Sequence, residues 1–116
     1  MTYKRIVIIE SPFKGDYERN TRYLNACIRD VILRGGLPYA SHKMVPGALD
    51  DTVGSERDLG IEVGLETAWS LVRDCGARVE FYLDCGMSAG MHRAWDFWNE
   101  RCGIPFVRYL GPDWES

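Results

Sequence analysis

The stretch RIVIIE, residues 5–10, decides the fold. Its nearly continuous β-branched run predicts a short strand that is covered on both faces, as a central strand of a parallel sheet is. The segment SPFKGD, residues 11–16, follows as a loop in which Asp16 can cap a helix. Apolar residues then recur every three or four positions over residues 17–34, which predicts an amphipathic helix ended by two glycines. Its expected core positions are Leu24, Cys27, Ile28, Val31 and Ile32.

The rest of the chain repeats this alternation of strand and helix. Ser55 and Asp58 have the spacing of a capping box at the start of a second helix, and Ser88 is a predicted cap of a third. The other expected elements are strands over 37–41, 78–84 and 104–110 and helices after residue 55 and over 88–101. This order predicts an α/β domain spanning 1–116, with helices on both faces of a mainly parallel sheet of four to five strands.

Composition excludes several classes of partner. The 116-residue chain has a formal net charge of −3, and its basic residues are scattered among acidic ones, so a nucleic-acid polymer is not expected as a partner. The sequence holds no apolar run of about 18 residues and no signal segment, so no membrane partner is expected either. The four cysteines include no CxxC pair, which is typical of reduced thiols, and a cytoplasmic location is predicted.

No cofactor or metal is expected. His42 and His92 lie far apart and have no cysteine or acidic ligand at zinc spacing. The loop after the first strand has neither the GxGxxG spacing of a dinucleotide site nor that of a P-loop.

Ligands of open α/β sheets bind outside the carboxyl ends of the strands, so the loops at 10–16, 41–57 and 84–91 are candidates for a site. The first loop precedes a helix N-terminus, which favours an anion, and Phe13 could stack on a base or sugar. A plain turn built from proline and glycine explains the same residues equally well. The candidate binding residues here are Ser11, Pro12, Phe13, Lys14 and Gly15.

The other two loops add charged and small side chains. The second holds His42 and Arg57, and Glu62 on the following helix matters only if its face turns toward the cleft. In the third, Asp84 ends a strand, where a carboxylate can meet ligand hydroxyls, and Ser88 could donate to a phosphate. Gly90 would let a ligand approach the backbone closely.

Several motifs together resemble the small nucleoside 2-deoxyribosyltransferase-like proteins. The likeness runs from about Ile6 to Tyr109. It adds Asn20 and Met91 to the expected binding residues, because they belong to two of these motifs. The motifs are SPFKGDYERN at 11–20, HKMVPGALDD at 42–51, ERDLGIEVGL at 56–65, GMSAGM at 86–91 and GIPFVRY at 103–109.

The resemblance implies a flavodoxin-like or Rossmann-like domain that binds a nucleoside or nucleotide, often in a cleft completed by a second subunit. It also implies a glutamate nucleophile in a GxxxE pattern at the start of the last helix, which forms a glycosyl-enzyme. The corresponding segment here is GMHRA, residues 90–94, so Ala94 stands where the nucleophile is expected. Asp96, two residues on, is rotated by about 200° around the helix and cannot substitute from the same face.

Three hypotheses follow. The first, ranked highest, is a protein that binds a nucleoside, a nucleotide or a nucleotide-derived signal without turning it over. The second is an N-glycosidic hydrolase or transferase that uses another carboxylate, with Asp84, Glu62 and Asp96 as candidates. The third is an interaction module, because Trp95 and Trp98 diverge by about 60° and one of them could face an interface. Trp114 could reach a neighbouring subunit, and a homo-oligomer is expected.

Overall fold

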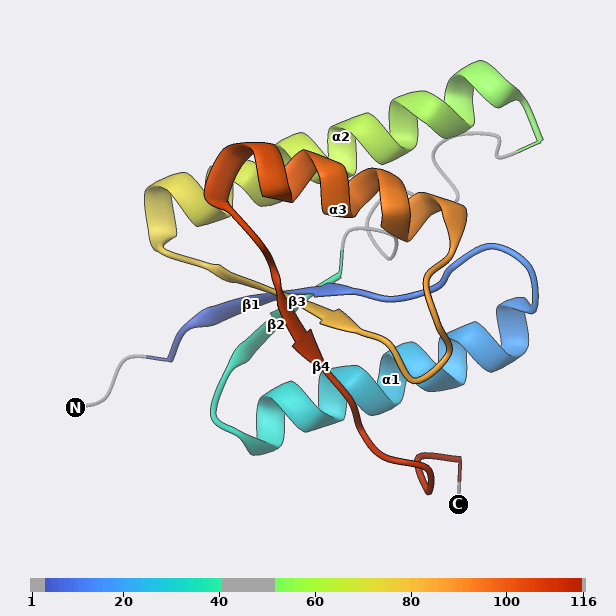
Figure 1. Cartoon of the computed structure of the whole chain (residues 1–116), viewed down its shortest axis with the longest axis vertical. Helices are drawn as coiled ribbons and strands as arrows, with labels where there is room; N and C mark the ends of the chain where they lie inside the picture. The colour runs from blue at the N-terminus through green and yellow to red at the C-terminus, as the bar shows by residue number, and fades with distance from the viewer. Residues whose placement is uncertain (1–3, 41–51, 116) are drawn as a thin grey trace.

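The computed structural model describes residues 4–40 and 52–115 and shows an α/β domain built on a four-stranded parallel sheet (Figure 1). The strand order is β2-β1-β3-β4, and each neighbouring pair is parallel. The predicted alternation and the predicted sheet are therefore confirmed. The elements are β1 (Ile6–Glu10), α1 (Tyr17–Leu33), β2 (Leu37–Tyr39), α2 (Gly54–Cys75), β3 (Arg78–Tyr82), α3 (Ala89–Cys102) and β4 (Phe106–Arg108).

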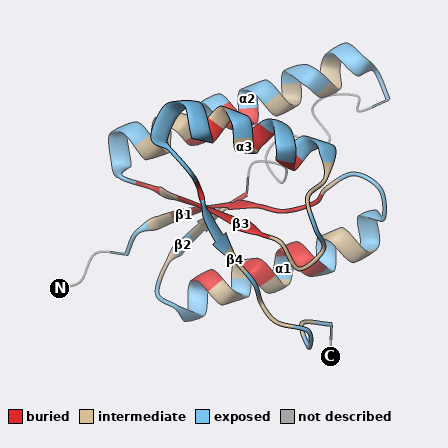
Figure 2. Ribbon diagram, viewed as in Figure 1, coloured by how far each residue is buried: buried red, intermediate tan, exposed pale blue. Residues whose placement is uncertain are grey.

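The helices form two layers around the sheet, so that the domain has the three layers of flavodoxin-like and Rossmann-like folds. α1 lies on one face, and α2 and α3 lie together on the other (Figure 1). Alternate residues of β1 enter the two cores, because side chains of a strand point to opposite faces. Ile8 packs with α2 and α3, whereas Val7 and Ile9 pack with α1. The buried residues are concentrated along β1 and β3 (Figure 2).

The topology fixes where a ligand site is expected. β1 is paired with β2 on one side and with β3 on the other, so the chain reverses its direction of winding between β1 and β3. Ligands of open α/β sheets bind at the carboxyl ends of the strands that flank such a switch point. In the register of this sheet, Glu10 at the end of β1 lies opposite Phe81 of β3.

Two local predictions are wrong. α2 begins at Gly54 and no side chain caps it: the Arg57 N–H already donates to the Val53 carbonyl (2.9 Å), so Ser55 lies inside the first turn and cannot act as the cap. Ile32 is 52% exposed, because the buried face of α1 is centred on Cys27 and Val31 and includes Tyr23 instead. The caps at Asp16 and Ser88 are confirmed.

Two further findings concern the chain as a whole. All four cysteines are free thiols. Within the described residues, none of the three helices has both the length and the apolar character needed to cross a bilayer.

Gly36 is a glycine at which packing leaves no room for a side chain. A Cβ there would lie 2.8 Å from Val31 Cγ1 and 3.2 Å from Val7 Cγ2, inside the core between α1 and β1. We expect Gly36→Ala to lower the free energy of unfolding by about 1–2 kcal/mol, because an extra methyl group forces packed neighbours apart. The measurement is urea unfolding at neutral pH. Gly54→Ala is the matched control, because a Cβ at Gly54 meets only the Arg57 guanidinium at 3.7 Å. Equal stability of both variants would contradict the prediction.

Candidate functional site

A cleft of about 720 Å³ opens at the carboxyl end of β1. Three parts of the chain surround it: the loop from β1 to α1, the N-terminal half of α2 and the N-terminal turns of α3. This is the position that the switch point between β1 and β3 predicts. Its volume lies within the range of about 300–1,000 Å³ that small-molecule sites have.

The cleft combines apolar walls with a cationic rim. Ile61 and Leu65 of α2 pack together with Met91 and Ala94 of α3 and form its apolar wall. Among the described residues that line the cleft, three carry a positive charge, namely Lys14, Arg57 and Arg93. Asp58 is an acidic neighbour with a side chain that is 61% exposed and 3.4 Å from the Arg93 guanidinium. The surplus of positive charge favours an anionic ligand group.

Glu10 lies at the inner end of this cleft and is only 7% exposed. The Trp98 indole N–H donates to Glu10 Oε2 over 3.3 Å. Burial raises the pKa of Glu10 to about 7, and the hydrogen bond from Trp98 offsets that rise only in part. Glu10 therefore titrates near neutral pH. Groups with pKa values shifted in this way are concentrated at functional sites.

Ser11 follows Glu10 and is 5% exposed. Its Oγ is fully enclosed and has no hydrogen-bond partner in the described part of the chain. An unsatisfied buried hydroxyl costs free energy, and a rotation of the Ser11 side chain toward a ligand in the cleft would recover it.

Glu10 is not among the residues predicted from the sequence. Even-numbered residues of β1 face α2 and α3, so the same alternation that buries Ile8 turns Glu10 toward the cleft. A carboxylate at the end of a central parallel strand was the signal that selected Asp84. The same signal applied to β1 would have found Glu10.

The predicted residues of the first loop are largely brought together. Ser11, Phe13, Lys14 and Gly15 line the cleft, whereas Pro12 is buried and does not. Asn20 does not line it either. The Asn20 amide donates to the carbonyls of Phe13 (3.1 Å) and Lys14 (3.2 Å), so Asn20 holds the shape of the loop.

The N-terminus of α3 supplies the opposite wall. Ser88, Gly90 and Met91 line the cleft as predicted, and Ser88 Oγ accepts from the Met91 N–H over 3.2 Å. Ala94 lines it too and is 4% exposed. Position 94, where the resemblance implies a nucleophile, therefore faces the cleft and carries a methyl group. Arg57 of α2 lines the same cleft, and His42 lies outside the described residues.

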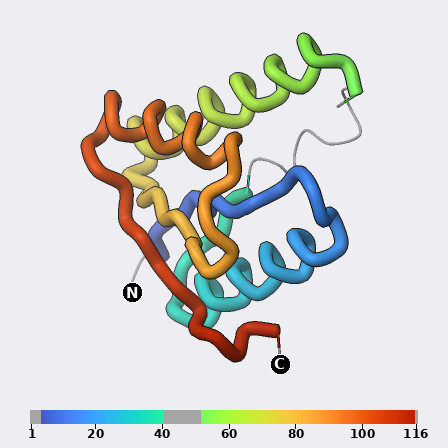
Figure 3. The backbone as a smooth tube through the Cα atoms, turned by 45° about the vertical axis from the view of Figure 1, so that its right-hand side comes forward, coloured from blue at the N-terminus to red at the C-terminus, as the bar shows by residue number. Residues whose placement is uncertain are grey.

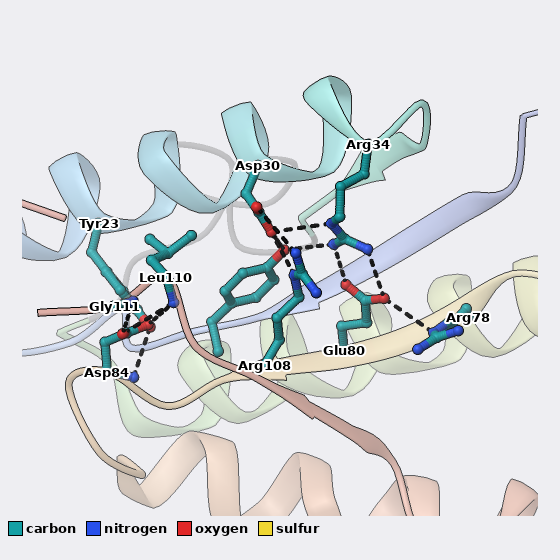
Figure 4. A network of polar contacts seen from close by, with 10 residues as sticks. Tyr23, Asp30, Arg34, Arg78, Glu80, Asp84, Arg108, Leu110 and Gly111 are labelled. Atoms are coloured by element: carbon teal, nitrogen blue, oxygen red, sulfur yellow. Dashed lines mark hydrogen bonds and ion pairs between the residues drawn. The ribbon is translucent and has the colours of Figure 1, made fainter. Parts of the chain in front are cut away.

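The structure does not bring the three candidate catalytic carboxylates to this cleft. Glu62 and Asp96 are exposed on the surfaces of α2 and α3 and are not among the lining residues. Asp84 is turned toward α1 and the C-terminal segment instead (Figure 4). Among the described residues, the carboxyl groups that line the cleft are those of Glu10 and Asp58.

Asp84 is held by hydrogen bonds that join three parts of the chain. Its carboxylate accepts from the Tyr23 hydroxyl (2.6 Å), from the Leu110 N–H (2.9 and 3.1 Å) and from the Gly111 N–H (3.0 Å). Burial acts to raise the pKa of Asp84, but these hydrogen bonds outweigh it and hold the pKa below its usual range. The arrangement is that of a structural carboxylate.

The tryptophans pack within their own chain. Trp98 is fully buried, and Trp95 makes an edge contact with Phe81 at a ring distance of 5.0 Å. Trp114 packs on Tyr23 of α1, with ring centroids 4.8 Å apart, because the C-terminal segment runs back past α1 (Figure 3). Trp69 packs against the core of α2 and α3. The expectation that one of these rings reaches a partner is not supported, and self-association stays a prediction.

In residues 4–40 and 52–115, no group of three or more histidine, cysteine or acidic side chains is arranged to hold a metal ion.

Comparison with known proteins assigns the family. Neither the curated proteins nor the solved structures give a match. A family model described as a domain of unknown function, DUF7768, matches residues 5–109. This range includes every described strand and helix and every described residue that lines the cleft. The chain belongs to the DUF7768 family.

Proposed function

We propose that this protein binds a nucleoside, a nucleotide or a nucleotide-derived signal in the cleft at the end of β1 and does not turn it over. The observation that carries the proposal is Ala94. It faces the cleft at the position where the resemblance to nucleoside 2-deoxyribosyltransferase-like proteins implies a glutamate nucleophile. Loss of the nucleophile from a covalent mechanism costs many powers of ten in rate.

The shape and charge of the cleft support such a ligand. The flat aromatic face of a base fits against the apolar wall that α2 and α3 form together, and the Phe13 ring also lines the cleft. A phosphate fits the rim formed by Lys14, Arg57 and Arg93, next to the N-terminus of α3. This surplus of positive charge favours a phosphorylated ligand over a bare nucleoside.

The alternative is an N-glycosidic hydrolase or transferase that acts through another carboxylate. Asp84, Glu62 and Asp96 do not line the cleft, so such an enzyme would have to use Glu10 or Asp58. Glu10 keeps its proton up to about pH 7, which makes it a poor nucleophile, and Asp58 is paired with Arg93. Binding without turnover is therefore the better supported function.

Retention of small molecules tests the proposal directly. Near-stoichiometric protein is incubated with a mixture of nucleosides and 5′-nucleotides, ultrafiltered and analysed by mass spectrometry. We expect one or a few unchanged members of the mixture to be retained. Free base that accumulates with time would show turnover and would favour the enzyme. Retention of no compound, with no free base formed, would contradict both functions.

Arg57 gives a prediction about the phosphate. We expect Arg57→Ala to weaken binding of a retained 5′-nucleotide about tenfold or more, because it removes a charge-assisted hydrogen bond, and to weaken binding of the matching nucleoside much less. Isothermal titration of both ligands measures the difference. Arg29→Ala is the matched control, because Arg29 is an exposed arginine on α1, across the sheet from the cleft. An equal loss for nucleotide and nucleoside would show that Arg57 does not contact the phosphate.

A further inference from the structure

We propose that Glu10 recognises the base of the bound ligand by donating a hydrogen bond from its neutral carboxyl group, with Ser11 as a second polar contact. This inference rests on the proposed function. It assigns a specificity-determining residue and a class of ligand, a nucleobase that presents an acceptor such as a ring nitrogen or a carbonyl oxygen. Nothing in the resemblance assigns a role to a carboxyl group at the end of β1.

The first step is the position of Glu10 beside the apolar wall that α2 and α3 form. The described lining residues on α2 and α3 nearest the core, Ile61, Leu65, Met91 and Ala94, present no side-chain hydrogen-bonding group. Glu10 and Ser11 are the buried polar residues that line the cleft. A base that lies against this wall must satisfy its own polar edge, and Glu10 and Ser11 are the buried polar residues beside it.

The second step is the location of the proton. Glu10 Oε2 accepts from the Trp98 N–H, and no described residue other than Trp98 is hydrogen-bonded to this carboxyl group. The carbonyl oxygen of a carboxylic acid is its better acceptor, so the proton belongs on Oε1. In the neutral acid Oε1 is therefore a donor that has no acceptor among the described residues, whereas the ionised form would be an acceptor only.

The third step concerns the phosphate. An ionised Glu10 at the inner end of the cleft would repel an anionic ligand group, while the cations lie at the rim. A neutral Glu10 removes this repulsion and suits a ligand whose base lies inside and whose phosphate lies outside. Burial keeps Glu10 neutral up to about pH 7 by raising its pKa.

The other charged groups that face Glu10 come from every element around the cleft. They are Lys14 from the loop after β1, Arg57 and Asp58 from α2, and Arg93 from α3. β3 presents the apolar Phe81 opposite Glu10. Comparison of the parent protein with Glu10→Gln isolates the part of any pH dependence that Glu10 contributes.

The test is the pH dependence of nucleoside binding. The probes are adenosine, cytidine, guanosine and uridine with their 2′-deoxy counterparts, because nucleosides lack the phosphate that titrates near pH 6. We expect affinity for the preferred probe to be constant at acidic pH and to fall about thirtyfold between about pH 5.5 and pH 8.5, given a pKa of about 7 for Glu10.

Glu10→Gln is the decisive variant. Its amide oxygen can accept from Trp98 while its NH₂ group keeps a donor in the cleft, so it imitates the neutral acid. We expect it to bind the same probe as tightly as the parent does at pH 5.5, with no loss at pH 8.5. Ser11→Ala is the companion variant, and we expect it to weaken binding severalfold while keeping the pH dependence of the parent.

The outcomes separate the two proposals. Failure of every nucleoside and nucleotide to bind the parent protein at any pH would overturn the proposed function. Binding that does not change with pH would leave the proposed function standing and overturn the role of Glu10. Binding by Glu10→Gln that falls with pH as the parent's does would overturn that role in the same way.

Discussion

Glu10→Gln is expected to be more stable than the parent protein by about 3 kcal/mol at pH 8. The pKa of Glu10 is raised by burial from 4.5 to about 7, and each pKa unit corresponds to about 1.4 kcal/mol between the folded and unfolded states. An unfolded chain releases this proton above about pH 4.5, whereas the folded chain holds it up to about pH 7. Ionisation therefore stabilises the unfolded state between about pH 4.5 and pH 7, and the free energy of unfolding of the parent falls as the pH rises through this interval.

Urea unfolding between pH 4.5 and pH 8.5 measures the effect. The two proteins should have the same free energy of unfolding at pH 4.5, where both carry a neutral group at position 10, and should diverge as the pH rises. Glu62→Gln is the matched control, because Glu62 is an exposed glutamate on α2. If the free energies of unfolding of Glu10→Gln and of the parent changed with pH in the same way, burial would not disfavour the ionised form of Glu10, and the prediction would be wrong.

The fold could be predicted because its signals are local. The β-branched run of β1, the spacing of apolar residues in α1 and the caps at Asp16 and Ser88 are each read within a few residues of the chain. The exact start of α2 was not predicted. Ser55 fits the sequence pattern of a cap, but it lies two residues after Val53, which occupies the N-cap position of the helix. Helix boundaries depend on geometry that the pattern alone does not contain.

The site residues that were predicted correctly are those whose place is set by the position of their loop in the fold. Ser11, Phe13, Lys14, Gly15, Ser88, Gly90 and Met91 line the cleft because the strand ends place their segments there. The roles of Glu10 and Asp84 depend on distant partners: Trp98 lies 88 residues from Glu10, and the Leu110 N–H belongs to a residue 26 positions after Asp84. Both residues are carboxylates at strand ends. Only their tertiary contacts show that Glu10 lines the cleft and that Asp84 is structural.

A second polar cluster shows the same dependence on tertiary contacts. Glu80 of β3 is buried beneath α1, where the Arg34 guanidinium contacts its Oε1 at 2.6 Å (Figure 4). Asp30 accepts from the Tyr82 hydroxyl (2.6 Å) and from Arg108 Nε (2.7 Å). These contacts tie the end of α1 to β3 and β4, on the face of the sheet opposite the cleft.

Asp84→Asn is expected to lose about 2–4 kcal/mol of stability, because an amide cannot replace a carboxylate that accepts from Tyr23, Leu110 and Gly111. Hydrogen bonds to charged groups contribute about 1.5–3 kcal/mol each, and the NH₂ group of asparagine would face a backbone N–H. Urea unfolding at pH 7 measures the loss. Asp96→Asn is the control, because Asp96 is exposed on α3 and should tolerate the same change.

Acid should have the same effect on the parent protein as this substitution. The pKa of Asp84 is held below its usual range, so the stability that Asp84 contributes is present above the unfolded-state pKa and is lost as the pH falls through the folded-state pKa. Glu10 acts in the opposite direction, since its contribution falls as the pH rises from about 4.5 to about 7. The parent should therefore be most stable in mildly acidic solution. In Asp84→Asn, the free energy of unfolding should depend less on pH on the acid side of this maximum and should keep its dependence on the alkaline side. If folded Asp84→Asn kept the stability of the parent but lost its ligand, Asp84 would belong to the site, because a structural carboxylate affects the fold first.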